Sequence, residues 1–144
     1  KMPVRKANAI WEGDLKSGKG IMSVESGLFT GAYSFGTRFE NAEGTNPDEL
    51  IGAALAGCFS MALSGDIVKA GYSVDEIRTE ASVSVEKVDG GFQITKITLD
   101  TKARVPEISM DEFAELASGA KKNCPVSKAL KAVDIHLQAH LLKQ

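Results

Sequence analysis

A stretch without any charge, from residue 50 to residue 65, constrains the fold of this chain more than any other segment. Asn46 ahead of it suits a helix cap and Pro47 suits the first helical position. The sequence therefore predicts a helix from residue 47 to Lys69, ended by Gly71. Small and apolar residues lie nearly all round this helix, so it must be covered on several sides. We expect it to pass through the middle of the structure.

The same apolar stretch is interrupted by Gly and Ser, and it falls short of the ~20 apolar residues that cross a bilayer. We therefore expect a buried helix in a soluble protein and no membrane partner. The segment KMPVRKANAI has too short an apolar run for a signal peptide, so the expected location is the cytoplasm. The 17 basic and 19 acidic residues are mixed along the chain and give a net charge of -2, which disfavours nucleic acid as a partner.

Alternating apolar and polar residues predict strands on both sides of the long helix. Three lie before it, at residues 9–12, 20–25 and 33–39, and two lie after it, at residues 77–85 and 92–99. The turn Asp89-Gly-Gly91 joins the last two into a hairpin. The alternation slips between Ile94 and Ile97, which predicts a bulge at that point.

The C-terminal part of the chain carries two further helix signals. Ser109 and Glu112 form a capping-box pattern ahead of an amphipathic segment, and Pro125 opens a short second helix. A closing strand is expected from residue 133 to residue 141. The order of strands, helix, strands, helices and strand predicts an α+β fold, with helices packed on antiparallel sheets. A chain of 144 residues fits one domain, residues 1–144.

The two cysteines are the candidate reactive groups. Cys58 lies in GAALAGCFSMAL, where it either packs as a small hydrophobe or faces an apolar substrate that the small neighbours admit. Cys124 precedes Pro125 at a predicted helix start, where backbone N–H groups and the helix dipole stabilise a thiolate, unless the residue is only a weak cap. Two cysteines are too few for a disulfide framework, and their placement favours redox chemistry.

Several motifs occur together in the chain: WEG from Trp11, TRF from Thr37, TNPDELIGAA from Thr45, AGCFSMA from Ala56 and NCPVS from Asn123. In this combination and order the chain resembles, over nearly its whole length, the OsmC (osmotically inducible protein C) branch of the OsmC/Ohr peroxidases. The resemblance implies an intertwined homodimer with antiparallel sheets around long central helices. It also implies reduction of organic hydroperoxides, and more weakly of hydrogen peroxide, in oxidative or osmotic stress. Dihydrolipoyl groups on protein partners are the implied dithiol reductant.

The resemblance also assigns roles to three residues. Cys58 matches the peroxidatic cysteine, Cys124 the resolving cysteine, and Arg38 the arginine beside them. The chemistry agrees, because a thiol in an apolar helix has a raised pKa unless a cation opposes it, and a guanidinium stays charged. The sulfenic acid formed on Cys58 would then condense with Cys124 to give a disulfide. Without the family, Arg38 would be interpreted as a strand-edge residue with an ion pair to Glu40.

A carboxylate at the start of the long helix orients the arginine in the family, where glutamate is usual. Asp48 matches that position here, with Glu49 next to it, so the arginine shifts, a water bridges, or Glu49 takes the role. Glu49 is alternatively only a cap partner of Asn46. Ten residues separate Asp48 from Cys58, about 15 Å along a continuous helix. Neither acid reaches its own Cys58, which suggests a site shared across the dimer interface.

The surroundings of Cys58 imply an apolar substrate pocket, for which Phe39, Phe59 and Met61 are candidate walls unless they belong to the core. We expect no metal and no cofactor: His136 and His140 should face solvent, and no close ligand cluster is present. GDLKSGK from Gly13 fits the first seven positions of a phosphate-binding P-loop, but Gly20 follows where the P-loop has Ser or Thr. We therefore interpret this segment as a hairpin turn. Two other functions remain open: a non-catalytic module that binds a small apolar ligand, and a structural stress protein.

Overall fold

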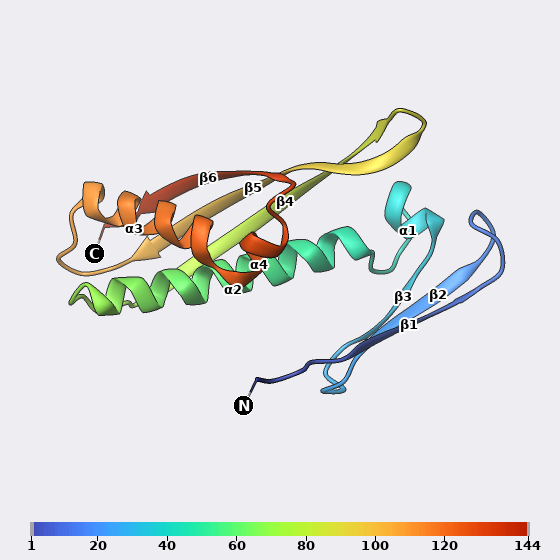
Figure 1. Cartoon of the computed structure of the whole chain (residues 1–144), viewed down its shortest axis with the longest axis horizontal. Helices are drawn as coiled ribbons and strands as arrows, with labels where there is room; N and C mark the ends of the chain where they lie inside the picture. Colours follow the sequence, from blue (N-terminus) through green and yellow to red (C-terminus); the bar gives the residue numbers. More distant parts are fainter. Residues whose placement is uncertain (1, 144) are drawn as a thin grey trace. The chain divides into compact units, whose positions relative to one another are not determined.

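The computed structural model describes residues 2–143, and it confirms the α+β class (Figure 1). Contacts within the chain group into two compact units, Lys1–Leu50 and Ile51–Gln144. Each unit has its own three-stranded sheet, and one long helix begins in the first unit and continues through the second.

The first unit is a small antiparallel sheet of β1 (Ala7–Glu12), β2 (Lys19–Val24) and β3 (Thr30–Tyr33), with β2 in the centre. The strands lie side by side at the blue end of the ribbon in Figure 1. Residues 13–18 form the predicted turn between β1 and β2, where the Asp14 carboxylate accepts hydrogen bonds from Ser17 N (2.7 Å) and Ser17 Oγ (2.8 Å). Two of the three expected strands before the long helix are therefore confirmed.

The third expected strand, residues 33–39, was wrong over most of its length. Strand β3 ends at Tyr33, and a short helix α1 (Phe35–Phe39) follows. Ser34 and Thr37 cap this helix reciprocally: Ser34 N donates to Thr37 Oγ1 (2.8 Å), and Thr37 N donates to Ser34 Oγ (3.2 Å). This capping box satisfies two backbone N–H groups at once, and it overrides the alternation of apolar residues that favoured a strand.

The long helix α2 (Pro47–Lys69) begins and ends as predicted. Asn46 Oδ1 accepts a hydrogen bond from Glu49 N (2.7 Å), and Gly71 follows with a φ of 102°, in the left-handed region that favours glycine. One face of α2 is fully buried in the core of the second unit; it consists of Leu55, Phe59, Leu63 and Ile67. The helix packs by one stripe rather than on all sides within the described chain.

By length and composition alone, α2 is also long and apolar enough to cross a membrane, with 23 residues and a mean hydropathy of 1.6. The uncharged stretch from residue 50 to residue 65 is shorter than a span, and the helix reaches this length because it extends beyond that stretch at both ends. The absence of a membrane partner stays a prediction.

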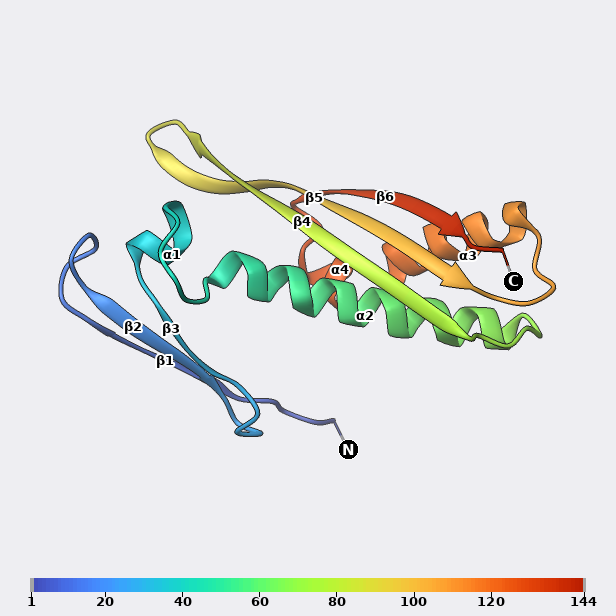
Figure 2. The ribbon, with the colours of Figure 1, turned by 180° about the vertical axis from the view of Figure 1, so that it is seen from behind.

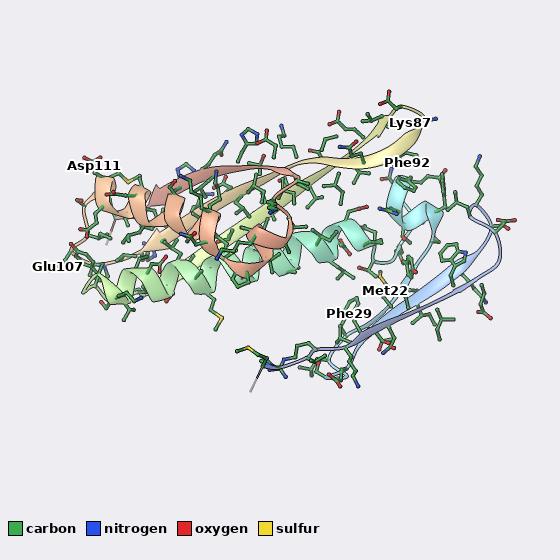
Figure 3. All side chains as sticks on the ribbon, viewed as in Figure 1. Met22, Phe29, Lys87, Phe92, Glu107 and Asp111 are labelled. Carbon is green, nitrogen blue, oxygen red and sulfur yellow. The ribbon has the colours of Figure 1, made fainter. Side chains whose placement is uncertain are left out.

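The second unit contains a sheet of β4 (Glu76–Val88), β5 (Gly91–Arg104) and β6 (Asp134–Leu141), with β5 in the centre. Asp89 and Gly90 form the turn of the β4–β5 hairpin with φ values of 49° and 82°. The register shifts so that Ser84 pairs with Lys96 and Val85 with Ile94, which confirms the predicted bulge. The hairpin runs out well beyond β6 (Figure 2), and Lys87 and Phe92 lie near its end (Figure 3).

The sheet of this unit is mixed rather than antiparallel, because β6 pairs parallel to β5. Parallel neighbours need a crossover connection, and here two helices provide it: α3 (Met110–Asn123) and α4 (Pro125–Ala129). Ser109 Oγ caps α3 by accepting from Glu112 N (3.1 Å). The Glu112 side chain does not complete the capping box; its Oε1 accepts a hydrogen bond from the Tyr72 hydroxyl (2.6 Å) instead.

Candidate active site

The two cysteines are neighbours in the second unit, although 66 positions separate them in the sequence. Cys58 lies half-buried on α2 and packs against the core. Cys124 is the N-cap of α4 and only 1% exposed. Both are free thiols. The crossover after β5 brings Cys124 back over α2, and this is how the fold places one sulfur beside the other.

The surroundings of Cys58 within this unit favour its neutral form. Burial raises the pKa of the Cys58 thiol, the backbone N–H of Val126 opposes this by donating a hydrogen bond, and the neighbouring Cys124 thiol raises the pKa again. Desolvation disfavours a charged sulfur, whereas a hydrogen-bond donor favours it. The net direction is upward, so the thiolate needs a further positive influence to form near neutral pH.

Ser127 makes two hydrogen bonds with the Cys124 sulfur. The Ser127 backbone N–H donates to Cys124 Sγ (3.4 Å), and the Cys124 thiol donates to Ser127 Oγ (3.0 Å). Ser127 is 5% exposed, so this is a buried contact. Sequence reasoning included Ser127 in a motif but gave it no role. The signal was its position three residues after the cap, where a helix N–H is free to meet a capping atom.

Arg38 and Asp48 form a two-point ion pair in the first unit. Arg38 Nε donates to Asp48 Oδ2 (3.0 Å) and Arg38 Nη2 donates to Asp48 Oδ1 (3.1 Å). The Asp48 side chain is 8% exposed and that of Arg38 is 35% exposed. Arg38 lies on α1. The alternative interpretation placed Arg38 at a strand edge, so that placement was wrong. The shorter aspartate side chain thus reaches the guanidinium directly.

Glu49 makes different contacts from Asp48. Its Oε2 accepts a hydrogen bond from the Thr45 hydroxyl (2.7 Å), and its backbone N–H donates to the Asn46 cap. Successive helical residues point about 100° apart, so only one of two adjacent carboxylates can face the guanidinium. In the described chain that residue is Asp48, and Glu49 serves the start of the helix.

A cavity of about 290 Å³ lies beside Arg38 in the first unit. It is lined by Trp11, Leu15, Tyr33, Ser34, Phe35, Arg38 and Phe39. Of the three expected pocket walls, only Phe39 lines this cavity. Phe59 is fully buried in the core of the second unit, and Met61 is 80% exposed on α2. Sequence reasoning missed Trp11, Tyr33 and Phe35 as lining residues, because they are close in space only once the sheet and α1 have formed.

No group of three or more metal-binding side chains occurs among residues 2–143. His136 and His140 are about half exposed, and each has a carboxylate partner: His136 Nε2 lies 2.8 Å from Asp134 Oδ2, and His140 Nε2 lies 3.4 Å from Asp100 Oδ1. Their solvent-facing position agrees with the sequence pattern. The absence of a metal or cofactor from the reaction stays a prediction.

Comparisons with known proteins place these features in context. A family model described as "OsmC-like protein" matches residues 40–138. The chain is 53% identical to Peroxiredoxin OsmC of Escherichia coli over 129 residues, which cover 89% of this chain and 90% of the relative. It is 33% identical to the organic hydroperoxide resistance protein OhrB of Bacillus subtilis over 102 residues, or 69% and 72% of the two chains.

Solved structures show the same fold. An OsmC-like protein from Mycoplasma pneumoniae superposes with a TM-score of 0.76 at 17% identity, covering 98% of this chain and 99% of the other. The structure of OhrB of Bacillus subtilis gives a TM-score of 0.68 at 23% identity, with 95% and 98% of the chains covered. At these identities the likeness supports the architecture alone.

Proposed function

The chain belongs to the OsmC family, and we propose how its residues reduce hydroperoxides. The protein is a thiol-dependent peroxidase that acts on organic hydroperoxides. The observation that supports the proposal best is the contact between the Cys58 and Cys124 thiols, which are free and adjacent. Adjacent thiols are what a two-cysteine cycle requires.

The cycle begins at Cys58. Its thiolate attacks the terminal oxygen of the hydroperoxide, the O–O bond breaks, and the alkoxide leaves with the bonding electrons and takes up a proton from solvent. Cys58 is now a sulfenic acid. The Cys124 thiolate attacks the Cys58 sulfur, hydroxide leaves and becomes water on protonation, and a disulfide links the two residues. The peroxide has been reduced by two electrons and the pair of thiols oxidised by two.

Arg38 is proposed to favour the thiolate and to bind the oxygens of the peroxide. A guanidinium keeps its charge at all relevant pH values and presents several N–H donors in one plane. Such donors stabilise the negative charge that develops on the leaving oxygen. Asp48 is then a positioning residue: its two hydrogen bonds fix the plane of the guanidinium. Glu49 supports the helix start rather than the arginine.

An external dithiol resets the enzyme by thiol–disulfide exchange, and dihydrolipoyl groups on protein partners are the proposed source. Intact-mass measurement after one equivalent of an alkyl hydroperoxide tests the cycle. We expect the chain to lose two hydrogens and dihydrolipoamide to restore them. Cys124→Ser is the control, because it should instead gain one oxygen at Cys58. Failure of the wild-type chain to change mass would refute the two-cysteine mechanism.

We further propose that the protein acts as a homodimer in the cytoplasm. On α2, the side opposite the buried stripe exposes small and apolar residues at helical spacing: Ala54, Gly57, Met61, Gly65 and Val68. A stripe of exposed small and apolar residues along one side of a helix favours an interface with a second copy of the chain. A composite site is tested by mixing inactive Cys58→Ala subunits with inactive Arg38→Ala subunits. Recovery of activity supports it, and no recovery despite proven subunit exchange contradicts it.

A further inference from the structure

Two rings of the cavity beside Arg38, those of Trp11 and Tyr33, pack over a glycine in the middle of the first sheet. In the strand register, Gly20 of β2 pairs with Trp11 on one side and with Tyr33 on the other. A Cβ atom at Gly20 would lie 2.6 Å from the Tyr33 ring and 2.7 Å from the Trp11 ring. The missing side chain lets both rings lie over the central strand, with their centroids 5.5 Å apart.

The indole of Trp11 is fixed in this position. Its Nε1 donates a hydrogen bond to the Gly13 carbonyl oxygen (3.0 Å), which anchors the polar edge of the ring in the β1–β2 turn. Trp11 remains 37% exposed, so the ring is held in place without being covered. An anchored and partly exposed aromatic ring is a prepared binding surface, because little side-chain freedom is lost when a ligand binds.

A second pair of rings comes from α1. Phe35 and Phe39 have centroids 5.0 Å apart, and the Arg38 guanidinium carbon lies 5.1 Å from the centre of the Phe39 ring. The capping box at Ser34 and Thr37 holds this short helix at the end of β3. The cavity therefore has four aromatic rings, from β1, β3 and α1, and one cation at its wall.

The cation has donors to spare. A guanidinium has five N–H bonds, and within residues 2–143 the ion pair with Asp48 uses two of them. Three N–H bonds are left for an oxygen ligand at the cavity wall. A molecule with a flat apolar body and a polar oxygen group would satisfy both kinds of lining at once.

We propose that this cavity is a substrate subsite that selects hydroperoxides with an aromatic body, whose oxygens bind Arg38 while the ring lies against Trp11 and Tyr33. The proposal rests on the proposed role of Arg38 and specifies the substrate class of that site. Aromatic rings attract other rings through offset or edge-to-face contacts beyond what apolar area alone provides. A compact alkyl group such as tert-butyl makes no such contacts.

Trp11 is the single tryptophan of the chain, so its fluorescence reports on this cavity directly. The probe is cumyl alcohol, the reduced form of cumene hydroperoxide, which has no O–O bond and therefore binds to the wild-type chain without turnover. We expect a saturable change in Trp11 emission with cumyl alcohol and none with tert-butanol at the same concentrations. Equal responses to both alcohols, or no saturable response to cumyl alcohol, would overturn the subsite.

Selectivity is measured by competition, in which cumene and tert-butyl hydroperoxides are supplied together and the two alcohols are quantified. At equal starting concentrations and low conversion, the product ratio equals the ratio of the two kcat/KM values and does not depend on the reductant. We expect Trp11→Leu to lower the preference for cumene hydroperoxide roughly two- to tenfold, which is the range for the loss of an aromatic pair. Trp11→Phe, which keeps a ring, should retain most of the preference and guards against a general folding defect.

Phe29 provides a matched control. Its ring covers Gly31 of β3, with Phe29 Cζ 2.8 Å from the position of a Cβ there, as the rings of Trp11 and Tyr33 cover Gly20. Phe29 lines a different cavity of the first unit together with Met22; both residues are labelled in Figure 3. Phe29→Leu should leave the product ratio unchanged. If Trp11→Leu also leaves the ratio unchanged, the subsite is refuted while the peroxidase stands; if the wild-type chain reduces neither hydroperoxide, the proposed function itself fails.

Discussion

Replacing Asp48 with asparagine tests the ion pair between Arg38 and Asp48, and a matched variant accounts for the effect of the lost charge on the start of α2. The side chain keeps its size and one hydrogen-bond acceptor for Arg38, but it loses its charge. The matched variant is Glu49→Gln, which removes one negative charge from the same first turn of α2. Both variants lose the interaction with the helix dipole, and only Asp48→Asn loses the two-point contact with the guanidinium.

The expected magnitudes follow from burial. A carboxylate in the first turn contributes about 0.5 kcal/mol through the helix dipole, and this applies to both variants. Breaking a fully buried pair costs about 3–5 kcal/mol, whereas an exposed pair contributes about 0.2–1 kcal/mol. Asp48 is nearly buried, but about a third of the Arg38 side chain is exposed and screened by solvent. We therefore expect about 2 kcal/mol of destabilisation for Asp48→Asn and about 0.5 kcal/mol for Glu49→Gln.

Urea unfolding at one fixed protein concentration measures the two stabilities, because an oligomer's apparent stability depends on concentration. Peroxidase assays on the same samples measure function. Asp48→Asn should lower kcat/KM by about tenfold, since a guanidinium that is held by one hydrogen bond instead of two positions the peroxide less well. Asp48→Glu should restore most of the loss by keeping the charge. Equal stability and equal activity of Asp48→Asn and Glu49→Gln would refute this account of the pair.

Three further predictions concern the second unit. Ser127→Ala removes a buried hydrogen bond to the resolving thiol, so it should slow disulfide closure after peroxide addition several-fold in stopped-flow measurements, while the first oxidation of Cys58 keeps its rate. Cys124→Ala removes a group that raises the pKa of Cys58, so alkylation of Cys58 followed by mass against pH should show a lower midpoint than in the wild type. The hydrogen bond to Glu112 raises the pKa of Tyr72. This hydrogen bond therefore stabilises the fold fully at pH values below the ordinary tyrosine pKa of about 10. The stabilisation is lost as the pH rises through the pKa of Tyr72 in the folded state. Tyr72→Phe should therefore be less stable than the wild type at pH 8 in urea unfolding, with a gap that narrows at strongly alkaline pH.

Elements with local signals could be predicted from the sequence almost to the residue. The Asn46 cap, Pro47 and Gly71 define α2 because each acts through its own backbone contacts. The β4–β5 hairpin has a two-residue turn in which both residues have a positive φ, and the bulge follows the break in apolar alternation. In each case the physical cause lies within a few residues of the observed feature.

The sequence predictions were wrong where contacts between distant residues, or competing local contacts, determine the structure. Residues 33–39 alternate like a strand, but the reciprocal cap between Ser34 and Thr37 turns the chain into α1. The direction of β6 depends on the crossover of α3 and α4, which no pattern within the strand itself encodes. The choice between Asp48 and Glu49 also lies beyond sequence reasoning, because it depends on which side of the helix faces α1.

The roles proposed for Cys58 and Arg38 follow from a conflict within the thiol chemistry. The immediate neighbours of Cys58 protect it from solvent and supply the second sulfur, yet burial and the Cys124 thiol both raise its pKa, against one opposing backbone N–H from Val126. An apolar setting suits a hydroperoxide with an apolar body, but the same setting suppresses the thiolate that must attack it. A charged group outside this apolar setting would resolve the conflict, because it would stabilise the thiolate without making the surroundings of the sulfur polar. Arg38, held in one plane by Asp48 and surrounded by aromatic rings, has the charge, the free donors and the apolar neighbours that this role requires.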